Sequence, residues 1–308
     1  MDNYDKIEEL FETVKDDPSN FQAVRELSVA LLDSGYNEEA LKQLVYLVGI
    51  FPEDSRLYFN IGFTFEKLKK YDKAEYSYRK AIELSPEESD YYYNLGYLLM
   101  RENRKIKEAV ECFKKVLEKE PKDPNTYFNL GIIYLKGKKW EFAAKCFRKA
   151  FTLNNFDILA LFYEGNAYHQ MGNTEKAKEI YNKVLEYSPE YSWAYYNLAE
   201  IAWNEQNIQE AKDYLEKTIS INPKDASASK LLSQIYLKES DYENAREILQ
   251  NALNENPYIS DFYYFLSKTY PNDKNKQIEC LSKAMENVKN LTIPASQIKN
   301  ELKKLKSQ

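Results

Sequence analysis

The sequence has little of what most catalytic sites require. Among 308 residues there is one histidine, His169, and there are three cysteines and eight glycines. A single histidine excludes a metal site built on paired imidazoles. The chain also lacks a C-x-x-C pair, an H-E-x-x-H motif and a glycine-rich phosphate loop. We therefore expect no catalytic residues, no metal and no cofactor.

The chain also lacks a long apolar run and an excess of positive charge. No stretch is apolar enough to cross a bilayer, and the opening MDNYDKIEELFE is too acidic for a signal peptide. The net charge of −6 argues against a general nucleic-acid binder. An odd, sparse set of cysteines fits a reducing compartment. We expect a cytoplasmic protein with neither nucleic-acid nor membrane partners.

Tyrosine, by contrast, is abundant, and it recurs in a fixed pattern. YFNIGFTF (58–65), YYYNLGYLL (91–99), YFNLGIIYL (127–135) and YYNLAEIAW (195–203) are variants of one phrase. Prolines end similar segments at spacings of 34 or 35 residues, and Asn155 stands where the series predicts one more. They are Pro18, Pro52, Pro86, Pro121, Pro189, Pro223 and Pro257. A fixed period of this size indicates stacked repeats of a supersecondary unit.

Numbering each repeat from 1 to 34, with proline at position 32, aligns three informative columns. The seven repeats begin at Phe21, Ser55, Ser89, Pro124, Ile158, Ser192 and Ala226, with one inserted residue allowed near 104–107. Position 8 is always small: Ser28, Gly62, Gly96, Gly131, Gly165, Ala199 and Ser233. Position 20 is always alanine: Ala40, Ala74, Ala109, Ala143, Ala177, Ala211 and Ala245. Position 24 is always large: Leu44, Tyr78, Phe113, Phe147, Tyr181, Leu215 and Leu249.

These columns predict two antiparallel helices per repeat. Small side chains allow helices to cross closely, so positions 8 and 20 are predicted to meet, with position 24 filling the gap beside the crossing. Proline lacks an N–H and disfavours helix before it, so position 32 ends the second helix. Neither helix can bury its apolar face alone, so neighbouring repeats must stack.

The pattern closely resembles the tetratricopeptide repeat family. The third repeat carries the family residues as Tyr92, Leu95, Gly96, Leu99, Ala109, Phe113, Val116 and Pro121. The resemblance covers residues 21–257. It implies an all-α fold, a right-handed α-solenoid (superhelix) of helix-turn-helix repeats. It also implies a non-catalytic scaffold or adaptor that binds a protein or peptide partner.

The ends depart from the repeat, as the ends of such arrays do. Residues 1–20 are predicted to form an N-terminal capping helix with Ile7, Leu10, Phe11 and Val14 turned inward. Seven repeats follow within 21–257, at 21–54, 55–88, 89–123, 124–157, 158–191, 192–225 and 226–259. A degenerate eighth repeat (260–289) and a C-terminal capping helix (290–308) complete a single solenoid. The apolar stripe of that last helix is Ile298, Leu302 and Leu305.

The face that binds a partner is predicted from helical geometry. Positions 2, 5, 9, 12 and 13 of each first helix lie together, opposite the core positions 4, 7, 8 and 11. In YYYNLGYLL, Tyr92 is then a core residue, whereas Tyr93 and Tyr97 line the inner, concave groove. The predicted peptide-binding residues are Phe59, Asn60, Phe63, Tyr93, Asn94, Tyr97, Phe128, Asn129, Phe162, Asn166, His169, Trp193, Tyr196, Asn197 and Trp203.

Two interpretations remain open for the aromatic residues at position 5, which occupy five consecutive repeats. They are an exposed strip, larger than soluble proteins usually carry, or they pack against the preceding repeat. The asparagines at position 6 are open in the same way. Their amides pair with the backbone of an extended peptide, at about 1 kcal/mol each, or they hold a local turn or a neighbouring helix. Trp193, at the usually solvent-facing position 2, favours a ligand role.

The cysteines are predicted to be packing residues, because Cys112, Cys146 and Cys280 all occupy position 23. Repeat stacking should hold Cys112 and Cys146 roughly 10 Å apart, which is too far for a disulfide.

The same repeat positions argue against one known ligand of the family. The family's clamp for the acidic tail of heat-shock chaperones needs Lys at position 5, Asn at 9 and 6, and Lys and Arg at 2 and 6 of three successive repeats. Only Asn60 fits, because Arg25, Val29, Asp90 and Asn94 hold the other places. We therefore expect no chaperone tail to bind.

Two further functions stay open. Residues 1–20 contain seven acids and two lysines, and residues 283–308 contain six lysines and two glutamates. We expect a monomer, with weak head-to-tail self-assembly as the alternative. The array could also be the substrate-recruiting arm of a separate enzyme.

Overall fold

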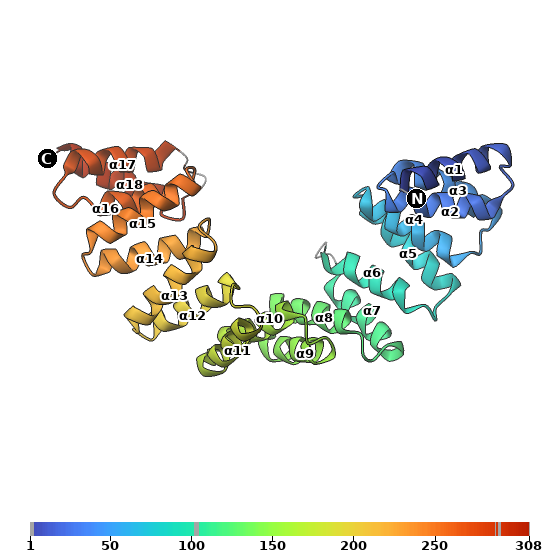
Figure 1. Ribbon diagram of the computed structural model, residues 1–308, viewed down its shortest axis with the longest axis horizontal. Coiled ribbons are helices and arrows are strands. Elements are labelled where there is room, and N and C mark those ends of the chain that lie inside the picture. The colour runs from blue at the N-terminus through green and yellow to red at the C-terminus, as the bar shows by residue number, and fades with distance from the viewer. Residues whose placement is uncertain (1–2, 102–104, 287, 289–290, 308) are drawn as a thin grey trace. The chain divides into compact units, whose positions relative to one another are not determined.

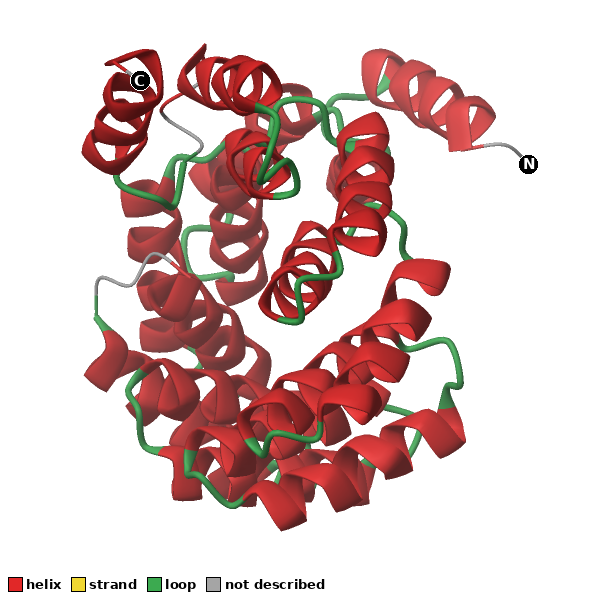
Figure 2. Ribbon diagram, turned by 90° about the vertical axis from the view of Figure 1, so that its left-hand side faces the viewer, coloured by secondary structure: helices red, strands yellow, loops and turns green. Residues whose placement is uncertain are grey.

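The computed structural model describes residues 3–101, 105–286, 288 and 291–307. This part of the chain contains eighteen α-helices and no β-strand, joined by short loops (Figures 1 and 2). The helices are α1 (Asn3–Asp16), α2 (Phe21–Asp33), α3 (Asn37–Ile50), α4 (Ser55–Lys67), α5 (Tyr71–Leu84), α6 (Ser89–Arg101), α7 (Ile106–Lys119), α8 (Pro124–Lys136), α9 (Trp140–Leu153), α10 (Ile158–Gln170), α11 (Thr174–Tyr187), α12 (Ser192–Asn204), α13 (Ile208–Ile221), α14 (Ala226–Lys238), α15 (Tyr242–Glu255), α16 (Ser260–Lys268), α17 (Lys274–Glu286) and α18 (Ala295–Ser307). The predicted all-α helical-repeat fold is confirmed.

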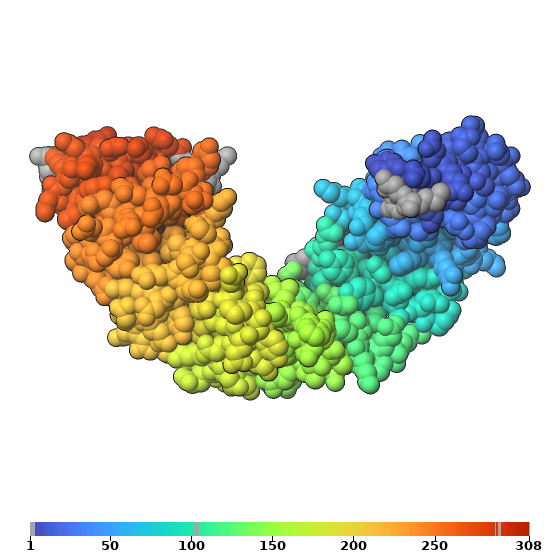
Figure 3. Space-filling view, in the orientation of Figure 1, coloured from blue at the N-terminus to red at the C-terminus, as the bar shows by residue number. Residues whose placement is uncertain are grey.

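Two compact units make up the chain. Unit 1 is Met1–Ala160 and unit 2 is Leu161–Gln308, so the boundary falls within α10. Within each unit, the strongest contacts join the two helices of one repeat, such as α4 with α5 and α12 with α13. Weaker contacts join each second helix to the first helix of the next repeat, such as α5 with α6. Side chains fill the space between neighbouring helices inside each unit (Figure 3).

The helix ends follow from local sequence. The carboxylates of Asp54, Asp123 and Asp225 cap first helices by accepting hydrogen bonds from backbone N–H groups one turn inside. Asn173 and Asp241 cap second helices in the same way. First helices of the full repeats have 13 residues and second helices have 14, for example α4 and α5. The repeat period is therefore set by two capped helices and the turns that join them.

In six of the seven repeats, the turn between the two helices contains a residue with left-handed backbone geometry at position 15. Positive φ occurs there in six repeats, at Gly35, Lys69, Lys138, Gly172, Gln206 and Ser240. In the third repeat this position lies among residues 102–104, outside the described part, as does part of the predicted insertion. Only two of the six are glycine, although this geometry costs other residues about 1–2 kcal/mol. The sequence interpretation missed this position.

The small column at position 8 lies against the large column at position 24. A Cβ added to Gly62 would come within 2.7 Å of the Tyr78 ring, and one added to Gly165 within 2.8 Å of the Tyr181 ring. The alanines at position 20 are all fully buried. At Gly62, Gly131 and Gly165 the nearest atoms belong to position 24, and at Gly96 they belong to Cys112 at position 23 and then to Phe113 at position 24. Positions 23 and 24 rather than position 20 therefore lie nearest to position 8, which corrects the predicted contact between positions 8 and 20.

The buried face of the first helices is wider than predicted. Tyr91 at position 3 is buried, whereas Tyr92, predicted to be core, is only half-buried at the margin of its cluster. Position 10 is buried as well, for example at Leu98 and Ile201. Each of these helices packs against its own second helix and against the preceding one, so more than one of its faces is covered.

The N-terminal helix α1 is covered on one side only. Its Ile7, Leu10 and Val14 pack on the cluster that includes Leu27. Phe11 was predicted to turn inward, but its side chain is 55% exposed. Ile7, Leu10 and Val14 pack on residues of α2 and α3, and Phe11 lies outside the arc of α1 that these contacts cover.

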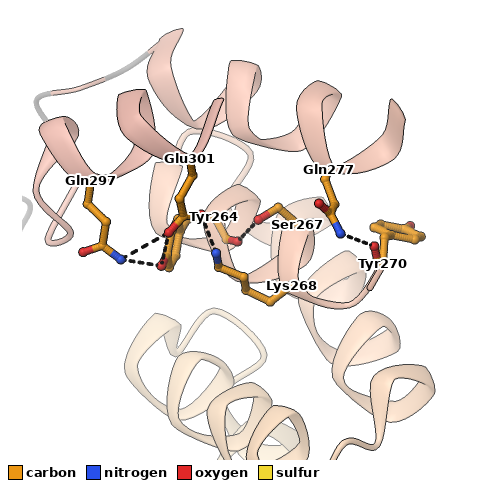
Figure 4. Close-up of polar contacts among 7 residues, drawn as sticks. All are labelled: Tyr264, Ser267, Lys268, Tyr270, Gln277, Gln297 and Glu301. Carbon is orange, nitrogen blue, oxygen red and sulfur yellow. Dashed lines mark hydrogen bonds and ion pairs between the residues drawn. The ribbon is translucent and has the colours of Figure 1, made fainter. Parts of the chain in front are cut away.

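The C-terminal helix α18 packs against unit 2 with Ile298 buried and Leu302 and Leu305 around it. A polar network joins α18 to α16 (Figure 4). Gln297 Nε2 donates to Tyr264 Oη at 2.7 Å, and Tyr264 Oη donates to Glu301 Oε1 at 3.3 Å. Lys268 forms an ion pair with Glu301. On α17, Gln277 donates to the backbone carbonyl of Tyr270.

A buried carboxylate holds the segment before α18. Asp261 on α16 accepts hydrogen bonds from the backbone N–H of Thr292 at 2.8 Å and from Lys230 Nζ at 2.6 Å. The Thr292 hydroxyl is a third donor. Burial raises the pKa of Asp261, but these hydrogen bonds outweigh it, so the pKa lies below its ordinary value.

Candidate functional site

The aromatic rings at position 5 pack inside their repeats. In unit 1, ring centroids 5.5 to 5.9 Å apart pair position 5 with position 24: Phe59 with Tyr78, Tyr93 with Phe113, and Phe128 with Phe147. In unit 2, Phe162 packs on Tyr181 in the same way, at 5.8 Å, and is only 5% exposed. Tyr196 is half-buried, and its hydroxyl donates to Glu200. The geometry therefore favours packing over a fully exposed strip.

The asparagines at position 6 make local hydrogen bonds. The side-chain amides of Asn94 and Asn197 donate to backbone carbonyls one turn earlier, at 2.8 Å and 2.7 Å. Asn129 is buried and donates to the Tyr93 hydroxyl at 3.1 Å. Asn60 is half-buried, and its backbone carbonyl accepts from the Thr64 hydroxyl. These contacts agree with the interpretation that asparagine at position 6 holds a local turn or a neighbouring helix. Because Asn129 is buried, its amide cannot reach a ligand.

Unit 1 contains a hollow between the first helices of its second and third repeats, here called the α4–α6 hollow. Its volume is about 540 Å³. Its lining is Phe63, Glu66, Lys67, Lys69, Tyr93, Asn94, Tyr97 and Arg101. Four of these are predicted groove residues, and Tyr97 is 38% exposed. The hollow lies where positions 5, 9 and 13 of adjacent first helices meet.

Charge in the α4–α6 hollow is mostly positive. Its carboxylate, Glu66, accepts a hydrogen bond from Tyr78 Oη at 3.2 Å and lies 3.5 Å from an Arg101 nitrogen. Lys67 Nζ lies 4.8 Å from the centroid of the Phe63 ring, a cation–π contact. Lys67 and Lys69 have no carboxylate partner in the part of the chain that the structure describes, and both are exposed.

Unit 2 contains a second hollow at equivalent repeat positions, here called the α12–α14 hollow. Its volume is about 330 Å³. Its lining is Tyr196, Glu200, Trp203, Asn204, Ser227, Lys230, Leu231 and Gln234. Lys230 is engaged by Asp261, and Lys238 Nζ lies 4.6 Å from the Trp203 ring. The side walls are thus aromatic, while the charges in the lining already have partners.

Phe162 and Asn197, described above, lie outside that hollow, and so do three further predicted residues of unit 2. Trp193 is 49% exposed, and its ring centroid lies 6.1 Å from that of Phe162. His169 is half-buried with its ring edge toward Tyr181, and its Nδ1 is buried with no hydrogen-bond partner among the described residues. Asn166 is half-buried. Of the three, Trp193 is the one that offers a large apolar surface to solvent.

The sequence interpretation missed the cations of the α4–α6 hollow. Lys67 and Arg101 both occupy position 13, which was predicted to face the groove, but the predicted binding residues were mainly aromatic residues and asparagines. Lys69 follows the helix at position 15, where no helical pattern applies. A basic residue at position 13 in adjacent repeats was the available signal.

Reactive groups are sparse. The three cysteines are free, and Cys112 and Cys280 are buried. Burial raises the pKa of the Cys112 and Cys146 thiols to about 11. In the described residues, no group of three or more His, Cys, Asp or Glu side chains is placed to hold a metal ion. None of the helices described combines the length and apolarity that a membrane span requires.

Comparison with known proteins identifies the repeat. Models of the tetratricopeptide repeat match residues 55–88, 77–111, 168–235 and 231–258, and a model described as TPR repeat matches 100–138. No curated protein matches the chain.

Solved structures share the fold. One is YrrB, described as a TPR protein with an unusual peptide-binding site: it is 25% identical with a TM-score of 0.53, over 60% of this chain and 94% of its own. Another is the C-terminal part of a TPR repeat-containing protein from Cytophaga hutchinsonii, 19% identical with a TM-score of 0.66, over 78% of this chain and 98% of its own. Yeast Tom70 is 15% identical with a TM-score of 0.57, over 93% of this chain and 61% of its own. Together these matches support a protein-interaction scaffold in general terms.

Proposed function

Because the chain belongs to the tetratricopeptide repeat family, we propose that it is a non-catalytic adaptor that holds a segment of a partner protein against the first helices of its repeats. The segment is an extended peptide or a short helix. The free, largely buried cysteines support a reducing, cytoplasmic setting for this role.

One observation carries the proposal. Each unit has a hollow between the first helices of successive repeats, and several repeat positions line both. Position 9 of the earlier helix contributes Phe63 to one hollow and Glu200 to the other, and position 5 of the later helix contributes Tyr93 and Lys230. Hollows that recur with the repeat can each take side chains of a partner segment, whereas a chance surface depression would have no reason to recur.

The lining suits a peptide ligand. Recognition sites combine apolar and aromatic walls with a few polar groups, and aromatic side chains carry much of the binding free energy at interfaces. Tyr97 and Trp193 offer exposed rings, while Phe63 and Trp203 form walls. The buried rings, such as Phe162, support these groups from below. YrrB, which shares the fold and is described as having a peptide-binding site, supports the same kind of ligand.

The test uses exposed rings whose loss should leave the fold intact. Tyr97→Ala with Trp193→Ala removes the two exposed rings on the first helices. Tyr76→Ala with Phe142→Ala is the matched control, because these rings are 68% and 57% exposed on the second helices α5 and α9. Affinity capture from source-cell lysate should recover a partner with the wild type and the control, and lose it with the first variant.

The same partner on all three proteins would move binding to the second helices or to the ends of the chain. Circular dichroism and melting curves that are equal for the three proteins are the required check on folding.

A second candidate is self-association through the ends. Helix α1 exposes Tyr4 and Phe11 beside its acidic residues, and α18 carries Lys299, Lys303 and Lys304. Sedimentation should then show mass that rises with protein concentration and falls with added salt. A monomer at every concentration would end this candidate.

A further inference from the structure

We infer that the α4–α6 hollow of unit 1 takes an acidic side chain of the partner segment, seated beside an apolar or aromatic one. The inference rests on the proposed function, because it names the chemistry of a ligand bound to the first helices. It assigns the charge contacts to Lys67, Lys69 and Arg101, and the apolar contacts to Phe63 and Tyr97.

The charge balance of the hollow points to an anion. Three cationic side chains and one carboxylate line it. The carboxylate, Glu66, is largely covered, since its side chain is 14% exposed and it accepts from Tyr78. Lys67 and Lys69 meet no carboxylate among the residues described, so two positive charges face solvent without a partner. A partner carboxylate would find donors already in place.

The apolar part of the lining determines which residue of the partner can lie next to the acidic one. Phe63 underlies Lys67 at 4.8 Å, so this ammonium is held at the ring face. Tyr97, 38% exposed, forms the opposite part of the lining from α6. A ring or aliphatic chain placed on Tyr97 would lose water contact while its neighbouring carboxylate reaches the lysines. Acidic residues next to large apolar ones therefore fit better than an acidic run alone.

The surroundings limit the site to this hollow. Beyond Tyr93, a smaller hollow of about 130 Å³ is lined by Asp90, Glu120 and Asp123, and it is unsuited to an anion. Glu120 accepts from Ser89, and Asp123 caps α8. In unit 2, the α12–α14 hollow has its lysine, Lys230, paired with Asp261. The unpaired cations thus distinguish the α4–α6 hollow from its counterpart.

This site differs from the family's clamp for acidic chaperone tails. That clamp uses positions 2, 5, 6 and 9, where the third repeat has Asp90, Tyr93, Asn94 and Tyr97. Here the cations come from positions 13 and 15, at the C-terminal ends of first helices and in the turn that follows.

A matched pair of variants isolates the charge. Lys69 and Lys138 occupy position 15 in different repeats, with φ of 58° and 55°, but only Lys69 lines the hollow. Replacing either by glycine removes one positive charge and relieves the same backbone geometry. Lys69→Gly should therefore weaken binding while the fold becomes more stable, and Lys138→Gly should only become more stable.

The probe is a phage-displayed random dodecapeptide library, selected on the full chain. Enriched peptides should pair Asp or Glu with an aromatic or aliphatic residue. Their affinity, measured by fluorescence anisotropy, should fall about tenfold in Lys67→Gln/Lys69→Gly/Arg101→Gln. It should be unchanged in Lys138→Gly, and added salt should weaken it in the wild type.

The other outcomes separate this inference from the proposed function. Peptides without acidic enrichment that need Tyr97 but ignore the three charge changes would overturn the inference and leave the proposed function standing. Failure to enrich any peptide that depends on Tyr97 or Trp203 would count against both. Self-association in sedimentation that the charge changes abolish would make the occupant a second copy of this chain and overturn a foreign acidic segment.

Discussion

The ring of Phe147 occupies the space that a side chain at Gly131 would need. A Cβ built on Gly131 would lie 2.6 Å from Cε1 of that ring, closer than real contacts allow. The relation holds through the array, because glycine at position 8 always faces Tyr or Phe at position 24. Where position 8 is Ser28, Ala199 or Ser233, position 24 is leucine. The two columns therefore divide one volume between the two helices of a repeat.

Gly131→Ala should destabilise the protein by about 1–2 kcal/mol, because overpacking outweighs the better helix propensity of alanine. Phe147→Leu in the same chain should recover much of that loss, since the sixth repeat already combines Ala199 with Leu215. Urea denaturation of the two single variants and the double variant measures the coupling. Additive effects would contradict the shared volume. Gly49→Ala is the control, because no atom lies within 4 Å of a Cβ there.

Lys138→Gly should stabilise the fold by about 0.5–1 kcal/mol. Lys138 has φ of 55°, which strains an L-residue, and the relief exceeds the entropy that glycine loses on folding. Gln206→Gly should behave alike, because its φ is 66°. The reverse change, Gly172→Ala at φ of 75°, should destabilise. The measurement is the shift in melting temperature, and no shift in any of the three would refute the strain.

Tyr93→Ala and Tyr97→Ala should differ in stability although both rings line one hollow. Tyr93 packs on Phe113 and accepts a hydrogen bond from Asn129, so its removal should cost about 3 kcal/mol. Tyr97 is 38% exposed, and its removal should cost less than about 1 kcal/mol. Chemical denaturation compares them, and equal losses would mean that Tyr97 is packed as tightly as Tyr93.

Acid should weaken unit 2 through Asp261. Its folded pKa is depressed, so the stability it contributes is present above the pKa of an unfolded aspartate, about 4, and is lost as pH falls through the lower folded pKa. Asp261→Asn should lower stability at pH 7 by about 2 kcal/mol, because Lys230 then lacks its charge partner. It should also flatten the decline of melting temperature between about pH 4 and 2. A decline of unchanged steepness would place the acid sensitivity elsewhere.

Cys112 and Cys146 should react slowly with iodoacetamide in the folded protein. Burial raises the pKa of each thiol to about 11, so at pH 8 the reactive thiolate is roughly a hundred times scarcer than for a free cysteine. The labelling rate, followed by intact mass, should rise with pH and reach the free-cysteine rate in urea. Rapid labelling at pH 8 without urea would show that these helices open readily.

Part of the candidate site was predictable from the sequence. The period of 34 residues places Tyr97 and Trp193 on the outward arc of their helices, and both are exposed. The burial of position 5 was not predictable, because Phe162 and Tyr196 share a register but differ in their surroundings. The rings of Tyr181, Tyr191 and Trp193 surround Phe162, which is buried, whereas Tyr196 is half-buried. The exposure of Phe11 was not predictable either, because it depends on how many helices pack around α1.

Periodicity and side-chain size within one repeat were enough to predict the helix pairs and the columns of small residues at position 8 and large residues at position 24. The contact between those two columns came from the structure, since the sequence paired position 8 with position 20. Only the tertiary structure decided which polar groups keep partners. Asn129 donates a hydrogen bond to Tyr93 of the preceding repeat, whereas Lys69 lines the α4–α6 hollow and has no carboxylate partner among the described residues. A repeat pattern sets the direction of a side chain on its own helix, but its burial and charge environment come from atoms on the next.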